Sequence, residues 1–166
     1  MAIAPSDATL QELVSTLPPG RVLTDPDLLD RYRHDHADLV DGGWPLGVVR
    51  PHGTGEVEAA MRAASAHGVP VVPRGAGSGL SGGAAAIDGG LVVCTEEMTR
   101  ILEIDPASMV ARVEAGVLNG ALKEAAAEHG LWYAPDPASR DFSTIGGNIA
   151  TNAGGLCCVK YGVTRD

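Results

Sequence analysis

Apolar residues recur at helical spacing near the start of the chain. Thr9-x-x-Glu12 is typical of a capping box, in which two side chains satisfy N–H groups at a helix N-terminus. The residues at the spacing of one helical face are Leu10, Leu13, Val14 and Leu17. Pro18-Pro19-Gly20 ends the pattern, so we expect a helix up to this point.

A second, shorter helix is predicted before residue 45. Asp25-Pro26 is typical of an N-cap followed by proline at the first helical position, and this helix should continue to about Arg33. The segment Ala37–Pro45 is predicted to be a loop. Residues 1–45 are therefore expected to form a helical N-terminal extension, and 46–166 a separate domain.

The next segment has the pattern of a β-α-β unit. Two short apolar strands, Leu46–Arg50 and Val69–Val72, flank a helix that we expect to begin at Thr54 as N-cap and to end at Gly68. Its inward residues should be Val57, Ala60, Met61 and Ala64. Because such crossovers join parallel strands, the two strands are predicted to be parallel neighbours.

The pattern changes after residue 90. Three strand-like runs separated by turn signals predict an antiparallel meander at Gly90–Thr95, Thr99–Asp105 and Ser108–Glu114. An alanine-rich helix from Asn119 to His129 should end at Gly130, and a brief strand is expected at Leu131–Ala134. The overall expectation is an α+β fold, with a small parallel subdomain followed by a mainly antiparallel sheet with helices.

Two glycine-rich segments carry the candidate chemistry. The first follows the strand at 69–72 and runs Pro-Arg-Gly-Ala-Gly-Ser-Gly-Leu-Ser-Gly-Gly from Pro73 to Gly83; Arg74 is its one charged residue. Because glycine permits positive φ, such a loop can turn several N–H groups toward one anion. The second segment, Ser143–Gly155, lies in a stretch without charged side chains up to Val159, which suggests backbone close to a ligand.

Three phosphate-binding interpretations compete for the first loop. Gly77-Ser-Gly-Leu-Ser-Gly82 matches the dinucleotide fingerprint G-x-G-x-x-G, but that fingerprint requires a helix to begin at the loop, and the segment before residue 91 is too short for one. A P-loop requires Gly-Lys-Ser/Thr, which Gly82-Gly83-Ala84 lacks. The third interpretation is a loop whose backbone amides alone hold a pyrophosphate, completed by the second segment.

Composition narrows the classes of partner. A formal net charge of −9 argues against nucleic-acid binding, which needs a basic face. The three cysteines form no disulfide framework, and neither a signal peptide nor a run of about 20 apolar residues occurs, so no integral membrane segment is expected. A cytoplasmic location is predicted, with peripheral membrane association left open.

Three motifs in order carry a family resemblance: Pro73–Gly83, Pro135-Asp-Pro-Ala-Ser139 and Ser143–Gly155. Together, from about Leu46 to Asp166, they resemble the FAD-binding domain of the vanillyl-alcohol oxidase / p-cresol methylhydroxylase (PCMH) type. Within it, the chain is most similar to the branch that holds D-lactate dehydrogenase, D-2-hydroxyglutarate dehydrogenase and the D subunit of glycolate oxidase.

The resemblance implies a role for each motif. The first loop would wrap the FAD pyrophosphate through Pro73, Arg74, Gly75, Ala76, Gly77, Ser78, Gly79, Leu80, Ser81 and Gly82. The later motifs would line the flavin and ribityl side through Asp136, Pro137, Ser139, Thr144, Gly146, Gly147, Asn148, Thr151, Ala153, Gly154 and Gly155. Some relatives attach FAD to a histidine at the first loop; this chain has none between His67 and His129, so non-covalent FAD is expected.

Three further groups of residues could bind a metal, take part in redox chemistry or stack on a flavin, but each also has an ordinary structural explanation. His34-Asp35-His36 could bind a metal, but an exposed acidic helix end is favoured, and no metal is predicted. Cys157-Cys158 could be redox-active or simply small packing residues. Trp132 and Tyr133 could stack on a flavin, although core packing is favoured.

The resemblance also implies that the chain is an N-terminal fragment, incomplete at its C-terminus. The substrate-binding domain of the hydroxyacid branch, with its catalytic residues, would lie elsewhere, and the electron acceptor is unknown. The complete enzyme would pass a hydride from the α-carbon of a D-2-hydroxy acid, of glycolate or D-lactate type, to the flavin, giving the 2-oxo acid. An FAD-linked oxidase of the same superfamily acting on another alcohol, and a non-catalytic fragment, remain as alternatives.

Overall fold

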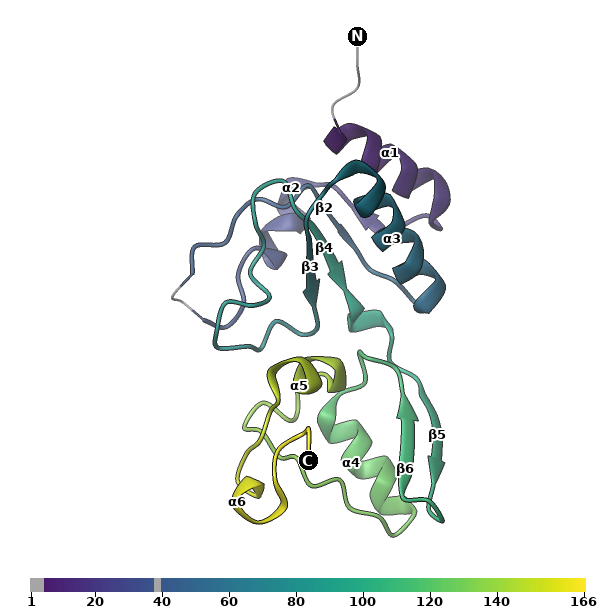
Figure 1. Ribbon diagram of the computed structural model, residues 1–166, viewed down its shortest axis with the longest axis vertical. Helices are drawn as coiled ribbons and strands as arrows, with labels where there is room; N and C mark the ends of the chain where they lie inside the picture. Colours follow the sequence, from purple (N-terminus) through teal and green to yellow (C-terminus); the bar gives the residue numbers. More distant parts are fainter. Residues whose placement is uncertain (1–4, 38–39) are drawn as a thin grey trace. The chain divides into compact units, whose positions relative to one another are not determined.

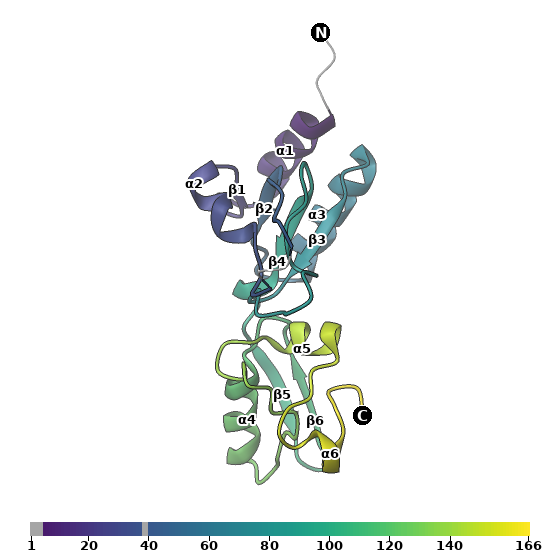
Figure 2. The same ribbon diagram turned by 90° about the vertical axis from the view of Figure 1, so that its left-hand side faces the viewer.

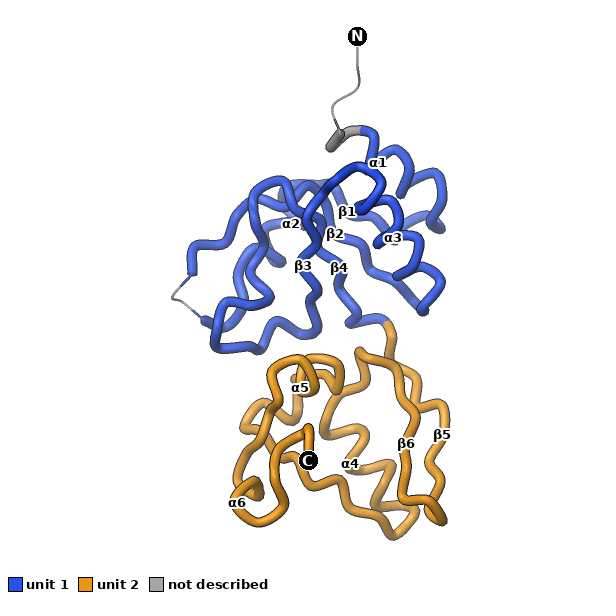
Figure 3. The backbone as a smooth tube through the Cα atoms, viewed as in Figure 1, with its two compact units in different colours: residues 1–97 blue, residues 98–166 orange. Residues whose placement is uncertain are grey.

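The computed structural model describes residues 5–37 and 40–166. The chain forms two compact units, residues 1–97 and residues 98–166, which are coloured separately in Figure 3. Within the described residues no helix combines the length and the apolar character needed to cross a lipid bilayer.

The first unit is built on a four-stranded sheet (Figure 1). The strands are β1 (Val22–Leu23), β2 (Gly47–Val49), β3 (Val71–Arg74) and β4 (Leu91–Cys94), in the order β1-β2-β4-β3. Strands β2 and β3 both pair with β4 in parallel, and β1 is antiparallel to β2 at one edge.

The position of β4 corrects two predictions. The strands of the β-α-β unit are parallel but not neighbours, because β4 lies between them; consequently the run Gly90–Thr95 belongs to this sheet and not to an antiparallel meander. All four residues of β4 are buried, which fits a central strand covered on both faces. The sequence showed this continuous apolar run, but its length could not reveal which sheet it joins.

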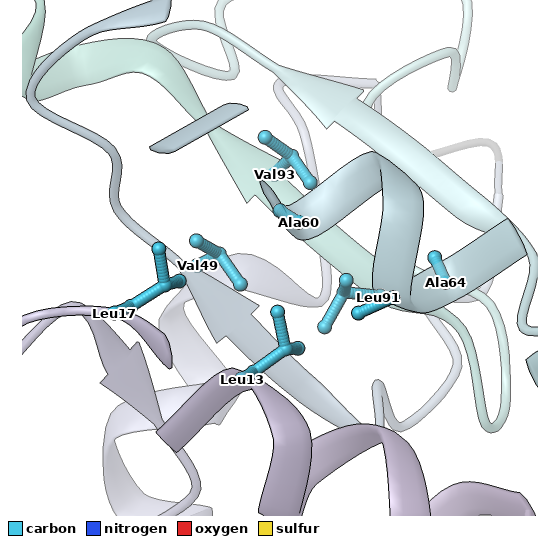
Figure 4. Packing of buried hydrophobic residues seen from close by; sticks show 8 residues of the cluster. Leu13, Leu17, Val49, Ala60, Ala64, Leu91 and Val93 are labelled. Carbon is cyan, nitrogen blue, oxygen red and sulfur yellow. The ribbon is translucent and has the colours of Figure 1, made fainter. Parts of the chain in front are cut away.

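Helices cover both faces of the sheet (Figure 2). Alternate residues of β2 and β4 belong to two different buried clusters, because successive side chains of a strand point to opposite faces. On one face α1 (Pro5–Thr16) and α3 (Thr54–His67) bring Leu13, Leu17 and three alanines of α3 against Val49, Leu91 and Val93, as Figure 4 shows. On the other face the short helices α2 (Pro26–Leu29) and η1 (Asp30–Tyr32) pack against the remaining strand residues. That second cluster contains Leu29, Tyr32, Val48, Val72, Ala86, Val92 and Cys94.

The helix ends agree with the sequence in two places and differ in two. Asp25 accepts a hydrogen bond from the Asp27 N–H at 3.0 Å and so caps α2, as predicted. Gly68 ends α3 with φ 68°, also as predicted. Thr54 is not the N-cap of α3, because that position is taken by Gly53. The capping-box prediction is wrong, because α1 begins four residues before Thr9. Thr9 is therefore not at the N-terminus of the helix, and it is fully buried.

Two apolar residues assigned to inward faces are exposed. Val14 is 60% exposed and Met61 46% exposed, whereas Leu13 and Ala60 are buried. One helical step rotates a side chain by about 100°, so Leu13 and its neighbour Val14 cannot both face the core.

The second unit contains a hairpin and three helices. Strands β5 (Ile101–Asp105) and β6 (Val110–Val113) pair antiparallel, as predicted. Helix α4 (Asn119–Glu128) follows, then α5 (Ile145–Thr151) and α6 (Cys158–Tyr161). Its buried cluster consists of Val117, Leu122 and Ile145, with Val113 and Tyr133 packed partly against it.

The strand predicted at Leu131–Ala134 does not form. The Leu131 N–H instead bonds the Ala126 carbonyl at the end of α4, and the Tyr133 carbonyl accepts from Lys123 Nζ at 2.8 Å. With these groups occupied locally, no strand ladder is built, and the segment is irregular up to an isolated bridge between Asp136 and Gly155.

The division of the chain into an extension at 1–45 and a domain at 46–166 stays a prediction. In the structure the described part of residues 5–45 contributes both to the core of the first unit, through α1, and to its sheet, through β1. The predicted loop at Ala37–Pro45 contains no helix or strand among its described residues; Asp38 and Leu39 lie outside them.

Replacing Leu13 should show that α1 is part of the core. Leu13→Ala should lower the free energy of unfolding by about 3 kcal/mol, because it removes buried methyl groups and leaves a cavity between α1 and the sheet. Urea denaturation followed by circular dichroism measures the loss. The matched control is Val14→Ala on the same helix, which should change stability by less than about 0.5 kcal/mol. Equal losses in both variants would contradict the packing described.

Candidate functional site

The first glycine-rich segment forms a loop at the carboxyl end of β3. No helix or strand occurs between Gly75 and Gly90, so the helix that a dinucleotide fingerprint requires is absent, as predicted. Gly77 and Gly82 have φ values of 70° and 75°, which favour glycine. Ligands of open sheets with parallel strands commonly bind at this edge, outside the carboxyl ends of the strands.

The carbonyl groups at the start of the loop are held by the protein. The Arg74 carbonyl accepts from Thr95 Oγ1 at 3.4 Å, and the Gly75 carbonyl accepts from Cys94 Sγ at 3.6 Å. Cys94 is the last residue of β4 and pairs with Arg74 of β3, and Thr95 follows it directly. The central strand therefore anchors the beginning of the loop.

The remainder of the loop is anchored by the segment after η1. The His36 N–H donates to the Gly77 carbonyl at 2.9 Å, and the Ala86 N–H donates to the Arg33 carbonyl at 2.9 Å. The Asp35 carboxylate accepts from the Ala84 N–H at 3.4 Å. The Ala84 carbonyl accepts from the Arg74 guanidinium at 3.0 Å.

Most N–H groups of the same loop, in contrast to these carbonyls, have no hydrogen-bond partner among the described residues. No N–H group from Ala76 to Gly83 donates a hydrogen bond to any residue that the structure describes. A loop with several carbonyls held by the protein and N–H groups without a described acceptor can donate those N–H groups to an anion. A pyrophosphate, which offers several acceptor oxygens and negative charge, fits this donor set.

Burial keeps the anchoring thiol neutral. Cys94 is fully buried, and desolvation is the main cause that raises the pKa of its thiol from 9.0 to about 11. A protonated thiol can donate to the Gly75 carbonyl, whereas a thiolate could not. Nearby, burial and the hydrogen bond of the Tyr32 hydroxyl to Glu96, 2.8 Å long, raise the pKa of Tyr32 to about 12.

The second unit brings four of the predicted residues together. The Asp136 N–H donates to the Gly154 carbonyl at 3.1 Å, and a Cβ on Gly155 would overlap the Asp136 carbonyl; Pro137 follows in the same loop. Gly155 also has φ 130°, a conformation that favours glycine. Both this angle and the closeness of the Asp136 carbonyl therefore require glycine at this position. Lys123 holds the loop through the Pro135 carbonyl at 3.1 Å and the Asp136 carboxylate at 3.3 Å. The hydrogen bond from Lys123 is the largest cause lowering the pKa of Asp136.

The second glycine-rich segment contains a helix that the sequence did not suggest. Thr144 caps α5 by accepting from the Gly147 N–H at 3.2 Å. The N–H groups of Ile145 and Gly146 donate to the carbonyls of Val117 and Ala115, at 2.8 and 2.9 Å. The first N–H groups of α5 are therefore occupied within the second unit. The cap signal was Thr144, but two consecutive glycines are poor helix formers and concealed it.

Asn148 of α5 is buried in a polar network. Its side-chain Oδ1 accepts from Asn119 Nδ2 at 2.8 Å, and its Nδ2 donates to Ser143 Oγ at 3.2 Å. The Thr151 hydroxyl donates to the Gly147 carbonyl, and the carbonyl of Ala153 accepts from Thr164. Ser139 takes part only through its backbone carbonyl, which accepts from the Phe142 and Ser143 N–H groups.

Sequence reasoning missed several residues that shape the two segments. Cys94 and Thr95 anchor the glycine loop, and their signal was their place after a buried strand that ends at the same sheet edge. Asn119 and Lys123 lie on α4 and hold the second segment. Asp35 belongs to the motif weighed as a metal site; its carboxylate caps the backbone at Ala37 and Ala84 instead.

The other residues singled out have local surroundings of their own. Trp132 is 55% exposed and meets the Tyr161 ring edge-on at 4.6 Å. Tyr133 is half-buried and packs against the cluster of the second unit. Cys157 and Cys158 are free thiols. Among the described residues no group of three or more His, Cys, Asp or Glu side chains is arranged to hold a metal ion.

A large apolar groove lies within the second unit. It has a volume of about 1020 Å³ and is lined by the hairpin, by α4 and α5, and by the Leu131–Tyr133 segment. Apolar residues along it, such as Met109, Val110 and Ile149, are more than half exposed. The second unit thus exposes more large apolar side chains than its small cluster buries.

The first unit thus carries a helix-free glycine loop at the carboxyl edge of a parallel sheet, where a phosphate-containing ligand could bind. A family model described as an FAD binding domain matches residues 45–166, and the chain belongs to this family. The fold is also that of solved p-cresol methylhydroxylase, with a TM-score of 0.77, 20% identity, and coverage of 92% of this chain and 30% of that one.

The curated relatives of the chain include members of the D-lactate dehydrogenase and glycolate oxidase branch of this family. The chain is 39% identical over 155 residues to the D-lactate dehydrogenase of Anaerostipes hadrus, covering 93% of this chain and 32% of that protein. It is 47% identical over 122 residues to the glycolate oxidase subunit GlcD of Bacillus subtilis (strain 168), covering 74% of this chain and 26% of that protein. The chain thus spans between a quarter and a third of the length of these relatives, and the predicted resemblance is confirmed.

The buried thiol predicts a specific alkaline destabilisation. Because the folded state holds the Cys94 proton up to about pH 11 and the unfolded state releases it near pH 9, stability should fall between these values. By pH 10.5 the wild type should have lost about 2 kcal/mol more than Cys94→Ser, which keeps a donor without an alkaline titration. Urea unfolding at several pH values measures the free energy of unfolding of the wild type and of Cys94→Ser.

The matched control is Cys158→Ser, which replaces a half-buried thiol and should follow the wild-type pH profile. If the Cys94→Ser profile also coincides with the wild type, the thiol is not held protonated by the fold.

Proposed function

We propose that this chain binds FAD non-covalently and serves as the cofactor-binding part of an oxidoreductase that converts a D-2-hydroxy acid to the 2-oxo acid. The observation that carries the proposal is the glycine loop with its carbonyls anchored and its N–H groups available, in a chain that belongs to the FAD-binding family. The substrate class is suggested by the names of the relatives, a D-lactate dehydrogenase and a glycolate oxidase subunit.

The loop residues would hold the pyrophosphate by backbone contact. Several N–H donors at short range can bind a dianion strongly even in a protein with a net charge of −9, because charge-assisted hydrogen bonds act locally. The proposed contacts are residues 73–82. By the family resemblance, the proposed contacts to the flavin and ribityl side are Asp136, Pro137, Ser139, Thr144, Gly146, Gly147, Asn148, Thr151, Ala153, Gly154 and Gly155.

Bound FAD would accept the hydride that the substrate gives up, which is the chemistry a flavin supplies. The residues of this chain would bind and orient the cofactor; no acid or base for substrate oxidation is proposed among them. Non-covalent binding is supported by Ser78 and Ser81 in the loop and by the absence of histidine between His67 and His129. The free thiols support a reducing, cytoplasmic compartment.

The loop makes the pyrophosphate the recognised group, which predicts selectivity among flavins. The protein should bind FAD at least about 100-fold more tightly than riboflavin, because loss of even two hydrogen bonds to a charged group costs about 3 kcal/mol. Titration followed by flavin fluorescence measures both affinities. Acid precipitation should release all bound flavin into the supernatant.

Two glycines of the loop give a matched pair of variants. Gly82→Ala should weaken FAD binding about tenfold, because Gly82 has φ 75° and a Cβ would press on Val40. Gly83→Ala should bind normally, because no heavy atom lies within 4 Å of its Cβ position. Equal affinities for FAD and riboflavin, or equal effects of the two alanines, would contradict backbone recognition of the pyrophosphate.

The enzymatic part is tested in a hybrid protein. Residues 45–166 of this chain replace the matching segment of the B. subtilis glycolate oxidase subunit, whose identity over the aligned region is 47%. The hybrid should contain FAD and oxidise glycolate. A folded hybrid without flavin would refute cofactor binding by this chain, whereas a flavin-containing hybrid that is inactive toward glycolate would refute its role as the cofactor-binding part of such an oxidoreductase.

A further inference from the structure

We propose that Arg74 is a positioning residue that braces the glycine loop from within. The inference rests on the proposed function of the loop and concerns how its shape is held. Arg74 is the last residue of β3 and carries the single charged side chain of the Pro73–Gly83 segment, so the sequence alone predicts direct contact with an anion.

The guanidinium joins three parts of the first unit. Its Nη1 donates to the Ala84 carbonyl at 3.0 Å, on the far side of the loop, and to the Tyr32 carbonyl at 3.5 Å, at the end of η1. Its central carbon lies 5.7 Å from the centroid of the Tyr32 ring. The side chain therefore ties the start of the loop to its end and to the helix beneath it.

Gly77 completes the brace by lacking a side chain. A Cβ at this position would overlap the guanidinium of Arg74 and would lie 3.2 Å from its Nε. The space of the missing side chain is thus filled by the guanidinium, with Nη2 as its nearest atom. Gly77 also has φ 70°, so both its conformation and its contact require glycine.

A guanidinium binds a phosphate most strongly with two parallel N–H groups. In Arg74 Nη1 is committed to two backbone carbonyls, and the guanidinium packs against the backbone at Gly77. Among the described residues Arg74 forms no ion pair with a carboxylate. Arg74 therefore acts through hydrogen bonds and packing of its guanidinium. Lysine is a poor substitute, because its ammonium group lacks the planar guanidinium with its fixed N–H donors.

The brace can be measured without cofactor, by hydrogen exchange of two amides that hold the loop, those of His36 and Ala86. In the cofactor-free protein Arg74→Ala should speed their exchange about tenfold, the effect of losing one net hydrogen bond. Arg74→Lys should behave like Arg74→Ala in exchange and in loss of FAD affinity. The control is Arg62→Ala, an exposed arginine of α3, which should match the wild type.

A second pair of variants tests the role of Gly77. Gly77→Ala should reproduce the exchange of Arg74→Ala, and the double variant should add little, because both changes remove one contact. Gly89→Ala is the matched control: it has φ 68° with nothing within 4 Å, so it carries the backbone penalty without displacing a side chain.

Three outcomes decide the matter. Wild-type exchange in Arg74→Ala, with FAD affinity lost there but retained in Arg74→Lys, would overturn the brace and make Arg74 a phosphate ligand by charge. Gly77→Ala that behaves like Gly89→Ala would also overturn it. Faster exchange in Arg74→Ala, Arg74→Lys and Gly77→Ala supports the brace; if even the wild type then fails to bind FAD, the proposed function falls while the brace stands.

Discussion

The parallel pairing of β4 between β2 and β3 is the constraint on which the first unit depends. It makes β4 the central strand, buried on both faces, and forces the helices onto two sides of the sheet. It also brings the end of β4 beside the end of β3, where Cys94 and Thr95 hold the carbonyls at the start of the glycine loop. The core and the candidate site are therefore consequences of one strand order.

An acidic chain can present an anion site because the loop separates its two kinds of backbone group. The carbonyls of Arg74, Gly75, Gly77 and Ala84 accept hydrogen bonds from the protein itself, including one from a thiol that burial keeps protonated. The N–H groups of the loop remain available at short range. Binding of this kind depends little on net charge, since the attraction is between fixed dipoles and a nearby anion.

Much of this could be predicted from local sequence signals. Asp25-Pro26 and Gly68 have strong and specific conformational preferences, and the structure shows both where expected. The absence of a helix after residue 83 followed from length alone. The partners of β4 could not be predicted, because they depend on residues distant in sequence. The loss of the strand at Leu131–Ala134 has a local cause, hydrogen bonds to Ala126 and Lys123 of the preceding helix, which the apolar pattern of the segment does not reveal.

The second glycine-rich segment shows a different limit. Its glycines suggested backbone wrapped around a ligand, yet a Cβ on Gly146 would lie 2.9 Å from that of Ala115, and one on Gly155 would overlap Asp136. Composition reveals that something approaches the backbone closely. It does not reveal whether that neighbour is a ligand or the chain itself, and here the chain accounts for part of the glycine content.

The small cluster of the second unit has a consequence for how the chain unfolds. A two-stranded hairpin is marginal by itself, and three buried side chains give it little support, whereas the first unit has apolar clusters on both faces of its sheet. Local opening should therefore begin in residues 98–166, leaving the glycine loop folded. Half of the candidate cofactor contacts would then lie in the less cooperative part of the molecule, so that cofactor binding and local folding of that part are thermodynamically linked.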